Sequence, residues 1–190
     1  MWWRSRMTGG RTNHWGRISL RFGPHDFKGR SRDGLGEDWP IGYEDLKPWY
    51  DEVDRLVGIF GSVEGLENHP DGVFLPPPKP RCWELLVKQA ADRHQVTCIP
   101  SRLSIITRPH NGRAACHYCG QCNRGCAVNA NFSSTNVLVL PALETGRLTL
   151  VTDAMAREIT LDARGRADGV LYIDRSEERR VGKECCGECR

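Results

Sequence analysis

The sequence predicts an α+β fold in which helices and an antiparallel β-meander flank a cysteine-rich loop. Apolar residues recur at helical spacing near the middle of the first half, at Trp49, Val53, Leu56, Val57 and Phe60. Strand-like runs follow near the end, at 148–151, 156–161 and 169–173, and Ala163-Arg164-Gly165 supplies a turn between the last two. Between these regions, four cysteines stand within eleven residues.

The remaining elements follow from periodicity and from helix start and stop signals. In the first helix, we expect Pro48 in the opening turn and Gly61 at the end. A second helix is predicted at 83–93, and a short third helix at 134–144 that ends at Gly146. We expect a short strand or extended segment at 18–22, one or two strands at 96–107, and a linker at 66–81, which holds the run PPPKP.

The cysteine run carries the strongest chemical signal. Its spacing is C-x₂-C-x₂-C-x₃-C, formed by Cys116, Cys119, Cys122 and Cys126. This is the spacing with which ferredoxins bind an iron–sulfur cluster through thiolates, although Ala127 stands where that run has proline. Gly120 and Gly125 would let the backbone curl around a cluster. The run therefore favours a metal ligand set of all four cysteines, within a cluster loop at 113–130.

Two other interpretations of the run stay open. The first is a zinc knuckle in a binding module without redox activity, although structural zinc sites usually join two cysteine pairs across a longer spacer. The second is a set of disulfides or free thiols. A ferredoxin-like carrier without flavin is a further alternative, but such carriers are usually smaller and richer in cysteine.

Composition narrows the function classes. The chain has 190 residues and a net charge of +3, with its basic residues scattered rather than gathered in a stripe, so nothing indicates a nucleic-acid partner. No apolar stretch approaches the length that spans a membrane, so we expect no direct membrane span. No signal peptide opens the sequence.

Both ends of the sequence are unusual. The opening MWWRSRMTGG looks like an internal start, so we expect residues 1–174 to be an internal fragment of a longer domain. From about Ser176 the composition changes, and three cysteines crowd the last six residues. The stretch RSEERRVGKEC resembles translated sequencing adapter, so we expect 175–190 to be a non-native tail, excluded from fold reasoning.

Three segments in order resemble the glucose–methanol–choline (GMC) flavoprotein oxidoreductases. The segment GGRTNHWG at 9–16 resembles the family's glycine segment beside the flavin, and DWPIGYEDLKPWY at 38–50 resembles the helix that follows it. Residues 152–159 and 169–172 resemble two later strands of the family. The resemblance implies an incomplete α/β FAD-binding fold and an enzyme that oxidises the CH–OH group of an alcohol or sugar substrate with FAD.

The resemblance also implies which residues contact FAD. Six of them belong to the glycine segment, whose histidine binds FAD covalently in some relatives, and one is a backbone position that meets the adenine. These residues are Gly9, Gly10, Asn13, His14, Trp15, Gly16 and, at the adenine, Ala156. The family's G-x-G-x-x-G unit and its catalytic histidine do not occur in this sequence. We therefore assign no catalytic residue and expect this chain alone to be inactive.

The cysteine run narrows the resemblance to an iron–sulfur subgroup, the flavin subunits of bacterial glucose, fructose and gluconate dehydrogenases. These carry a three-iron cluster on a C-x₅-C-x₃-C pattern, which Cys116, Cys122 and Cys126 reproduce. Cys119 is additional, so both [3Fe–4S] and [4Fe–4S] stay open. The subgroup implies a dehydrogenase that passes electrons singly to an acceptor protein such as a cytochrome subunit.

Overall fold

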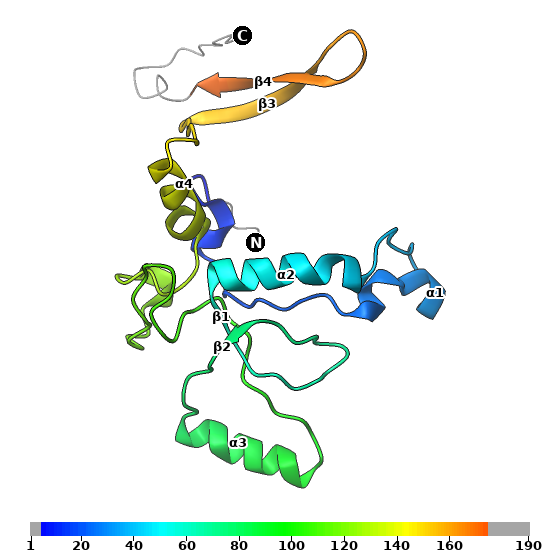
Figure 1. Cartoon of the computed structure of the whole chain (residues 1–190), viewed down its shortest axis with the longest axis vertical. Coiled ribbons are helices and arrows are strands. Elements are labelled where there is room, and N and C mark those ends of the chain that lie inside the picture. The colour runs from blue at the N-terminus through cyan, green and yellow to red at the C-terminus, as the bar shows by residue number, and fades with distance from the viewer. Residues whose placement is uncertain (1–4, 175–190) are drawn as a thin grey trace. The chain divides into compact units, whose positions relative to one another are not determined.

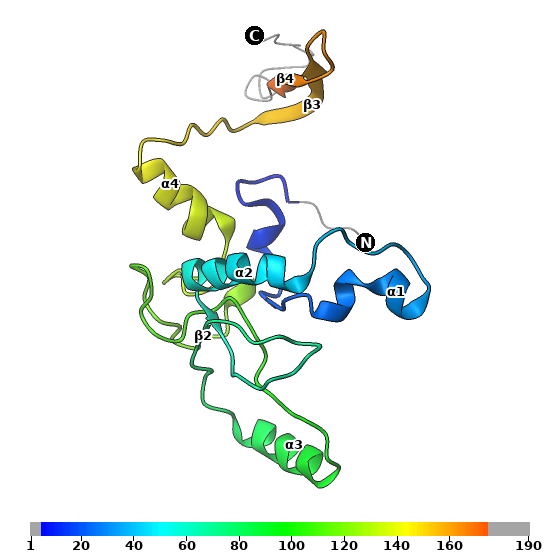
Figure 2. The same cartoon turned by 45° about the vertical axis from the view of Figure 1, so that its right-hand side comes forward.

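The computed structural model describes residues 5–174, apart from the side chain of Asn123. The predicted non-native tail lies outside these residues. The chain divides into two compact units between Pro141 and Ala142. Figures 1 and 2 show the helices and short strands of the first unit and the β-hairpin of the second. This mixture of helices and strands agrees with the predicted α+β class.

The first unit contains three α-helices and two very short strands. The helices are α1 (Gly29–Asp33), α2 (Tyr43–Val57) and α3 (Cys82–Arg93). Strand β1 (Ile59–Phe60) follows α2 directly and pairs in parallel with β2 (Phe74–Leu75). Helix α3 confirms the second predicted helix, and every residue of α3 is at least partly exposed.

The limits of α2 differ from the prediction at both ends. The helix begins at Tyr43, where the Asp45 side chain accepts a hydrogen bond from the Gly42 N–H, so Pro48 lies inside the helix rather than in its first turn. It ends at Val57 because Gly58 takes φ +78°. Phe60, which was expected on the helix, is instead a buried residue of β1.

The apolar core lies in the first unit, around β1 and the chain that follows α3. Leu103 pairs with Phe60 and with Ile18, and Ile105 pairs with Asn131, each as an isolated bridge. The segment 18–22 is therefore extended chain, and the prediction of one or two strands at 96–107 is wrong, because this segment forms only isolated bridges. The buried apolar residues among those described are Phe27, Tyr43, Val57, Ile59, Phe60, Ile106, Ala130 and Val137.

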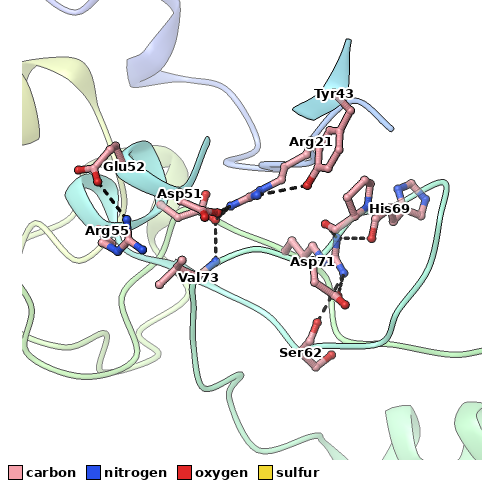
Figure 3. Close-up of polar contacts among 12 residues, drawn as sticks. Arg21, Tyr43, Asp51, Glu52, Arg55, Ser62, His69, Asp71 and Val73 are labelled. Atoms are coloured by element: carbon pink, nitrogen blue, oxygen red, sulfur yellow. Dashed lines mark hydrogen bonds and ion pairs between the residues drawn. The ribbon is translucent and has the colours of Figure 1, made fainter. Parts of the chain in front are cut away.

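Two buried arginines supplement this small core (Figure 3). Arg21 donates to Asp51 at 2.6 Å, to Asp54 at 2.5 Å and to the Tyr43 hydroxyl at 3.4 Å. Burial lowers the pKa of Arg21, but hydrogen bonds to Asp54, Asp51 and Tyr43 outweigh this effect and raise it overall. The charge of Arg21 therefore stays in place and ties the extended segment before α1 to α2.

Arg102 organises the loop between β1 and β2 in the same way. Its side chain is 2% exposed and donates to the carbonyls of His69 and Pro70, at 2.7 and 2.5 Å. It also donates to Asp71 at 2.9 Å, and its guanidinium lies 4.8 Å from the ring centre of Phe74. One cation thus fixes the loop that returns the chain from β1 to β2.

The second unit contains a β-hairpin instead of the expected meander. Strands β3 (Ala154–Leu161) and β4 (Ala167–Asp174) pair antiparallel. The Asp162 side chain accepts hydrogen bonds from the N–H groups of Arg164 and Arg166, which fixes the predicted turn. Residues 148–151 form no strand, so the first of the three predicted strands is wrong.

Helix α4 (Leu140–Glu144) contains the residues at which the chain is divided, Pro141 and Ala142. A π-helical turn over Thr135–Val139 precedes it, and Gly146 follows it with φ +70°. This confirms the short helix predicted at 134–144. Among the described residues, no helix has the length and apolar character needed to cross a membrane.

Candidate functional site: the cysteine pocket and the glycine loop

The cysteine run forms a loop whose two ends are fastened to one buried residue. Ile106 is fully buried, and its carbonyl accepts a hydrogen bond of 2.9 Å from the N–H of Cys116. Its own N–H donates, also at 2.9 Å, to the carbonyl of Ala130, four residues after Cys126. The core therefore holds the start and the end of the loop together, and the cysteines project from the segment between them.

All four cysteines line one pocket of about 220 Å³. Apolar side chains of the first unit form part of its wall, at Phe60, Leu103, Ile105 and Val128. Cys119 is exposed, whereas Cys116, Cys122 and Cys126 are partly buried. The fold thus brings together the four predicted ligands and leaves Cys119 the most accessible of them.

The backbone of the loop has the features expected of a thiolate binding site. Two N–H groups point at sulfur: Tyr118 N–H donates to Cys116 Sγ at 3.4 Å, and Ala130 N–H donates to Cys126 Sγ at 3.3 Å. Gly120 and Gly125 take φ +72° and +99°, in the left-handed region that favours glycine. Both glycines thus take backbone conformations that other residues rarely adopt.

The four sulfurs surround the pocket without converging on one point. Among the described residues, no three His, Cys, Asp or Glu side chains are grouped closely enough to hold a metal ion. The six cysteines at 82, 98, 116, 119, 122 and 126 are all free thiols. A loop with soft sulfur donors, backbone N–H groups and an apolar wall has the donor set that an iron–sulfur cluster uses.

Arg113 connects the start of this loop to α2. Its guanidinium donates to the carbonyl of Val57, the last residue of α2, and to the carbonyl of Asn129 at 3.4 Å. Burial lowers the pKa of Arg113. The side chain thus links the end of α2 to the chain that leaves the cysteine run.

The predicted flavin-contacting residues at 9–16 form a second loop, here called the glycine loop (residues 8–14), with its 3₁₀ turn at Gly10–Asn13. Gly9 has φ +90°, and a Cβ there would lie 2.3 Å from the hydroxyl oxygen of Thr135. Gly10 has φ +50°, and none of the described atoms lies within 4 Å of the place of its Cβ. Gly9 is therefore needed for packing within the protein, whereas Gly10 faces open space.

The other predicted residues of this region differ in their surroundings. His14 is exposed and ends the 3₁₀ turn. Trp15 packs edge-on against Phe132, with ring centres 6.1 Å apart. Asn13 donates from Nδ2 to the carbonyl of Thr8 at 2.9 Å, and Gly16 is exposed.

Ala156 lies in the second unit, on β3. It pairs with Tyr172 of β4, and the register shifts between Ala156 and Glu158, so Arg157 is an extra residue in the ladder. The predicted contact of the Ala156 backbone with adenine is thus assigned to a strand beside a bulge.

Two groups of residues around the site were missed by the sequence analysis. Arg17 donates to the carbonyl of Trp15 at 2.6 Å and to that of Asn13 at 3.2 Å, which holds the end of the glycine loop. Ser134 and Thr135 hold its start. Hydroxyl residues before an apolar run are helix-start signals, and such a signal does not indicate a contact with a distant loop.

The chain is similar in sequence to known oxidoreductases. Residues 101–185 match the protein family described as GMC oxidoreductase, and this range includes the cysteine run. The chain is 35% identical over 171 residues to 2-methyl-1,2-propanediol dehydrogenase of Mycolicibacterium austroafricanum, a match that covers 87% of this chain and 30% of that protein.

Two further relatives are more distant. Paromamine 6'-oxidase of Streptomyces fradiae is 28% identical over 177 residues, covering 91% of this chain and 32% of the relative. The fructose dehydrogenase large subunit of Gluconobacter japonicus is 27% identical over 180 residues, covering 87% and 31%. The chain spans about a third of the length of these curated relatives. Residues 101–185, which include the four cysteines of the run, are thus similar in sequence to the GMC oxidoreductases.

Proposed function

We propose that this chain is part of an FAD-dependent dehydrogenase that oxidises the CH–OH group of an alcohol or sugar and passes the electrons on through an iron–sulfur cluster. The observation that carries this proposal is the placement of four cysteines around one pocket, inside the segment that matches the GMC oxidoreductases. Two of the relatives are named as dehydrogenases, of a propanediol and of fructose, which supports a CH–OH substrate.

The cofactor supplies the redox chemistry, since a bound flavin accepts the hydride of an alcohol and a cluster passes electrons singly. This chain contributes binding and orientation. We assign Gly9, Gly10, Asn13, His14, Trp15 and Gly16 to the flavin surface, with Gly10 at its open face. We assign the backbone of Ala156 to the adenine. In the same proposal, His14 lies beside the flavin or is covalently linked to it.

The cysteines would hold the cluster as thiolates, and neighbouring groups would adjust its potential. Hydrogen bonds to cluster sulfurs and the exposure of the cluster to solvent both affect reduction potential. The N–H groups of Tyr118 and Ala130 already point at Cys116 and Cys126. Three partly buried cysteines and one exposed cysteine support a set in which Cys116, Cys122 and Cys126 are required and Cys119 completes a fourth position.

An electron-acceptor protein is the partner that this chemistry requires, because a cluster that takes electrons from flavin must deliver them elsewhere. We propose a cytochrome subunit or a protein of similar role. The relative named as a large subunit supports an assembly of more than one chain.

The test is anaerobic reduction of the complete protein that contains this sequence. It would be purified without oxygen and mixed with a panel of alcohols and sugars, while flavin absorbance and the reduction of an artificial acceptor are followed separately. We expect one or more substrates to bleach the flavin. Cys122→Ser should leave this bleaching intact and slow electron delivery to the acceptor by at least about tenfold.

Cys98→Ser is the matched control, because Cys98 is a free thiol outside the cysteine run. It should behave like the wild type in both measurements. A protein without flavin would reject the enzymatic part of the proposal. Flavin bleaching with equal acceptor reduction in Cys122→Ser and in the wild type would reject electron transfer through the cysteine pocket, and bound zinc would favour a zinc knuckle.

A further inference from the structure

The glycine loop is fastened to a segment more than a hundred residues later in the sequence. That segment comprises residues 130–135 and is here called the connecting segment. The Thr12 hydroxyl and the Ser134 hydroxyl lie 2.9 Å apart, and the Ser134 N–H donates to Thr12 Oγ1 at 3.0 Å. Thr135 Oγ1 donates to the carbonyl of Thr8 at 2.9 Å. Three hydrogen bonds thus join two short segments of the first unit.

The direction of these hydrogen bonds follows from the number of protons. Thr12 Oγ1 donates its single proton to the carbonyl of Gly9 at 2.6 Å. In the hydroxyl pair the donor is therefore Ser134, whose oxygen also lies 3.3 Å from the same Gly9 carbonyl. Both Ser134 and Thr12 consequently act on one peptide group.

This peptide group is the one between Gly9 and Gly10. Its carbonyl accepts from the hydroxyl and the N–H of Thr12, whose hydroxyl oxygen in turn accepts from Ser134, and its N–H, on Gly10, donates to the carbonyl of Met7 at 2.9 Å. A peptide between two glycines is otherwise free to rotate, because neither residue has a side chain that restricts φ. The hydrogen bonds on both sides hold it in one orientation.

The lack of a side chain at Gly9 leaves room for the hydroxyl of Thr135. A Cβ at Gly9 would lie 2.3 Å from Thr135 Oγ1, so a side chain at this position would displace the threonine hydroxyl. The Thr135 hydroxyl therefore occupies the space that a side chain at Gly9 would need. The open face of the loop is at Gly10, on the other side of the same peptide.

The other end of the connecting segment is fixed to the cysteine loop. Ala130 N–H donates to Cys126 Sγ at 3.3 Å, and Asn131 Nδ2 donates to the carbonyl of Cys122 at 3.3 Å. Ala130 and Asn131 are 0% and 4% exposed, and Phe132 packs against Trp15. A largely buried segment thereby links the glycine loop to the cysteine loop.

We infer that Ser134 and Thr135 are positioning residues of the glycine loop: Ser134 fixes the Gly9–Gly10 peptide through Thr12, Thr135 holds the Thr8 carbonyl before it, and together they fix the flavin-facing surface of the loop. The part that concerns flavin rests on the proposed function, whereas the fixing of the loop does not. Neither residue is a catalytic group. Each acts through the peptide that it holds.

The test uses the complete protein and four variants. Ser134→Ala and Thr135→Val remove one hydroxyl each, and Thr135→Ser keeps the hydroxyl while losing a methyl group. Thr145→Val is the matched control, because the Thr145 hydroxyl has only local partners, the carbonyl of Ala142 and the N–H of Arg147. Hydrogen exchange is measured at the amides of Gly10, Thr12 and His14, whose N–H groups are all hydrogen-bonded within the loop.

We expect exchange at these amides to accelerate roughly three- to tenfold in Ser134→Ala and Thr135→Val, the factor for losing one partly buried hydrogen bond. Thr135→Ser and Thr145→Val should exchange as the wild type does. The amides of Phe60 and Ile106, in the core, should keep their rates in every variant. Unchanged rates in the glycine loop, or an equal increase at Phe60 and Ile106, would overturn the inference.

A second measurement tests the part that concerns flavin. The dissociation constant for FAD should rise roughly three- to tenfold in Ser134→Ala and Thr135→Val, and it should not change in Thr135→Ser. A wild-type protein that binds no FAD would reject the proposed function and leave the exchange result to decide the positioning of the loop. A wild type that binds FAD, with equal affinity in all four variants, would overturn the positioning of the flavin surface alone.

Discussion

In the extended segment before α1, the apolar side chains are exposed and the arginines are buried, which is the reverse of what the alternation indicates. The alternation of Ile18, Leu20 and Phe22 predicts an apolar inner face, yet these three side chains are 61%, 50% and 57% exposed. The inward residues are Arg17 and Arg21, at 4% and 6%. Arginine is favoured there because carboxylates of α2 meet Arg21 inside the fold.

Arg21→Met should destabilise the complete protein strongly. The substitution leaves Asp54, which is 4% exposed, without its cation, and breaking a buried ion pair typically costs about 3–5 kcal/mol. The free energy of unfolding from denaturant titration measures the loss. Asp51→Asn is the control and should cost less, since Asp51 is 26% exposed. Equal losses in the two variants would show that burial of this pair does not matter.

Asp71 should make stability depend on acidity. Burial raises the pKa of this carboxyl, but hydrogen bonds from the N–H groups of Glu64 and Gly65 and the charge of Arg102 outweigh it, so the folded pKa lies below the usual value. Its contribution is therefore complete above about pH 4 and is lost as the pH falls through the folded pKa.

Asp71→Asn tests this dependence. The difference in melting temperature between the wild type and this variant should be largest near neutral pH and should shrink steadily below about pH 4. Asp92→Asn, on the exposed surface of α3, is the control and should show a small difference. A difference between wild type and Asp71→Asn that stays constant from neutral to acid pH would contradict the role of the charge.

Among the elements, α2 shows that local sequence signals predict a helix better than they predict where it begins and ends. The apolar spacing predicts the helix correctly, but Pro48 and Gly61 are poor guides to its limits. Asp45 provides the cap that begins the helix at Tyr43, and Gly58 ends it. The reason for Gly58 is tertiary, because a Cβ there would lie 2.4 Å from Cγ2 of Ile106, a residue far along the chain.

Gly58→Ala should therefore lower stability more than a change of backbone preference alone. Residues other than glycine at positive φ cost on the order of 1–3 kcal/mol, and the contact with Ile106 adds to this. Gly34→Ala is a matched control, since Gly34 has a similar φ of +75° and none of the described atoms lies near the place of its Cβ. The measurement is the free energy of unfolding of both variants, and equal losses would contradict the steric argument.

The candidate site could be predicted only in part from the sequence. The spacing of the cysteines is local, and all four line one pocket, whereas their role as metal ligands stays a prediction. The contacts of the glycine loop are not local. Ser134 and Thr135 reach Gly9 and Thr8 across more than a hundred residues, and a helix-start pattern contains no information about such a partner.

At the scale of the whole molecule, the described chain leaves many large apolar side chains in contact with solvent. On α2, Trp49, Val53 and Leu56 are 69%, 49% and 50% exposed and recur at helical spacing. On α3, Trp83 and Leu86 are 58% and 65% exposed. Exposed apolar faces of this kind promote association of the chain.

The chain of 190 residues, produced alone, should therefore self-associate. We also expect it to show no alcohol-oxidising activity. It lacks the G-x-G-x-x-G unit whose amides and helix N-terminus bind the FAD pyrophosphate in such folds, so it should also bind FAD weakly. Light scattering measures the association. Activity is assayed with FAD, a panel of alcohols and sugars, and an artificial acceptor. Turnover above the control without protein would show that the active site has been misplaced.

Metal and sulfide analysis tests the assignment of the cysteine pocket most directly. The complete protein would be purified without oxygen, and iron, zinc and acid-labile sulfide would be measured per chain in the wild type, in Cys116→Ser and Cys126→Ser, and in the Cys82→Ser control. We expect iron with sulfide in the wild type and the control, and loss of both in the two pocket variants. Zinc without iron in the wild type would contradict an electron-transfer centre at this pocket.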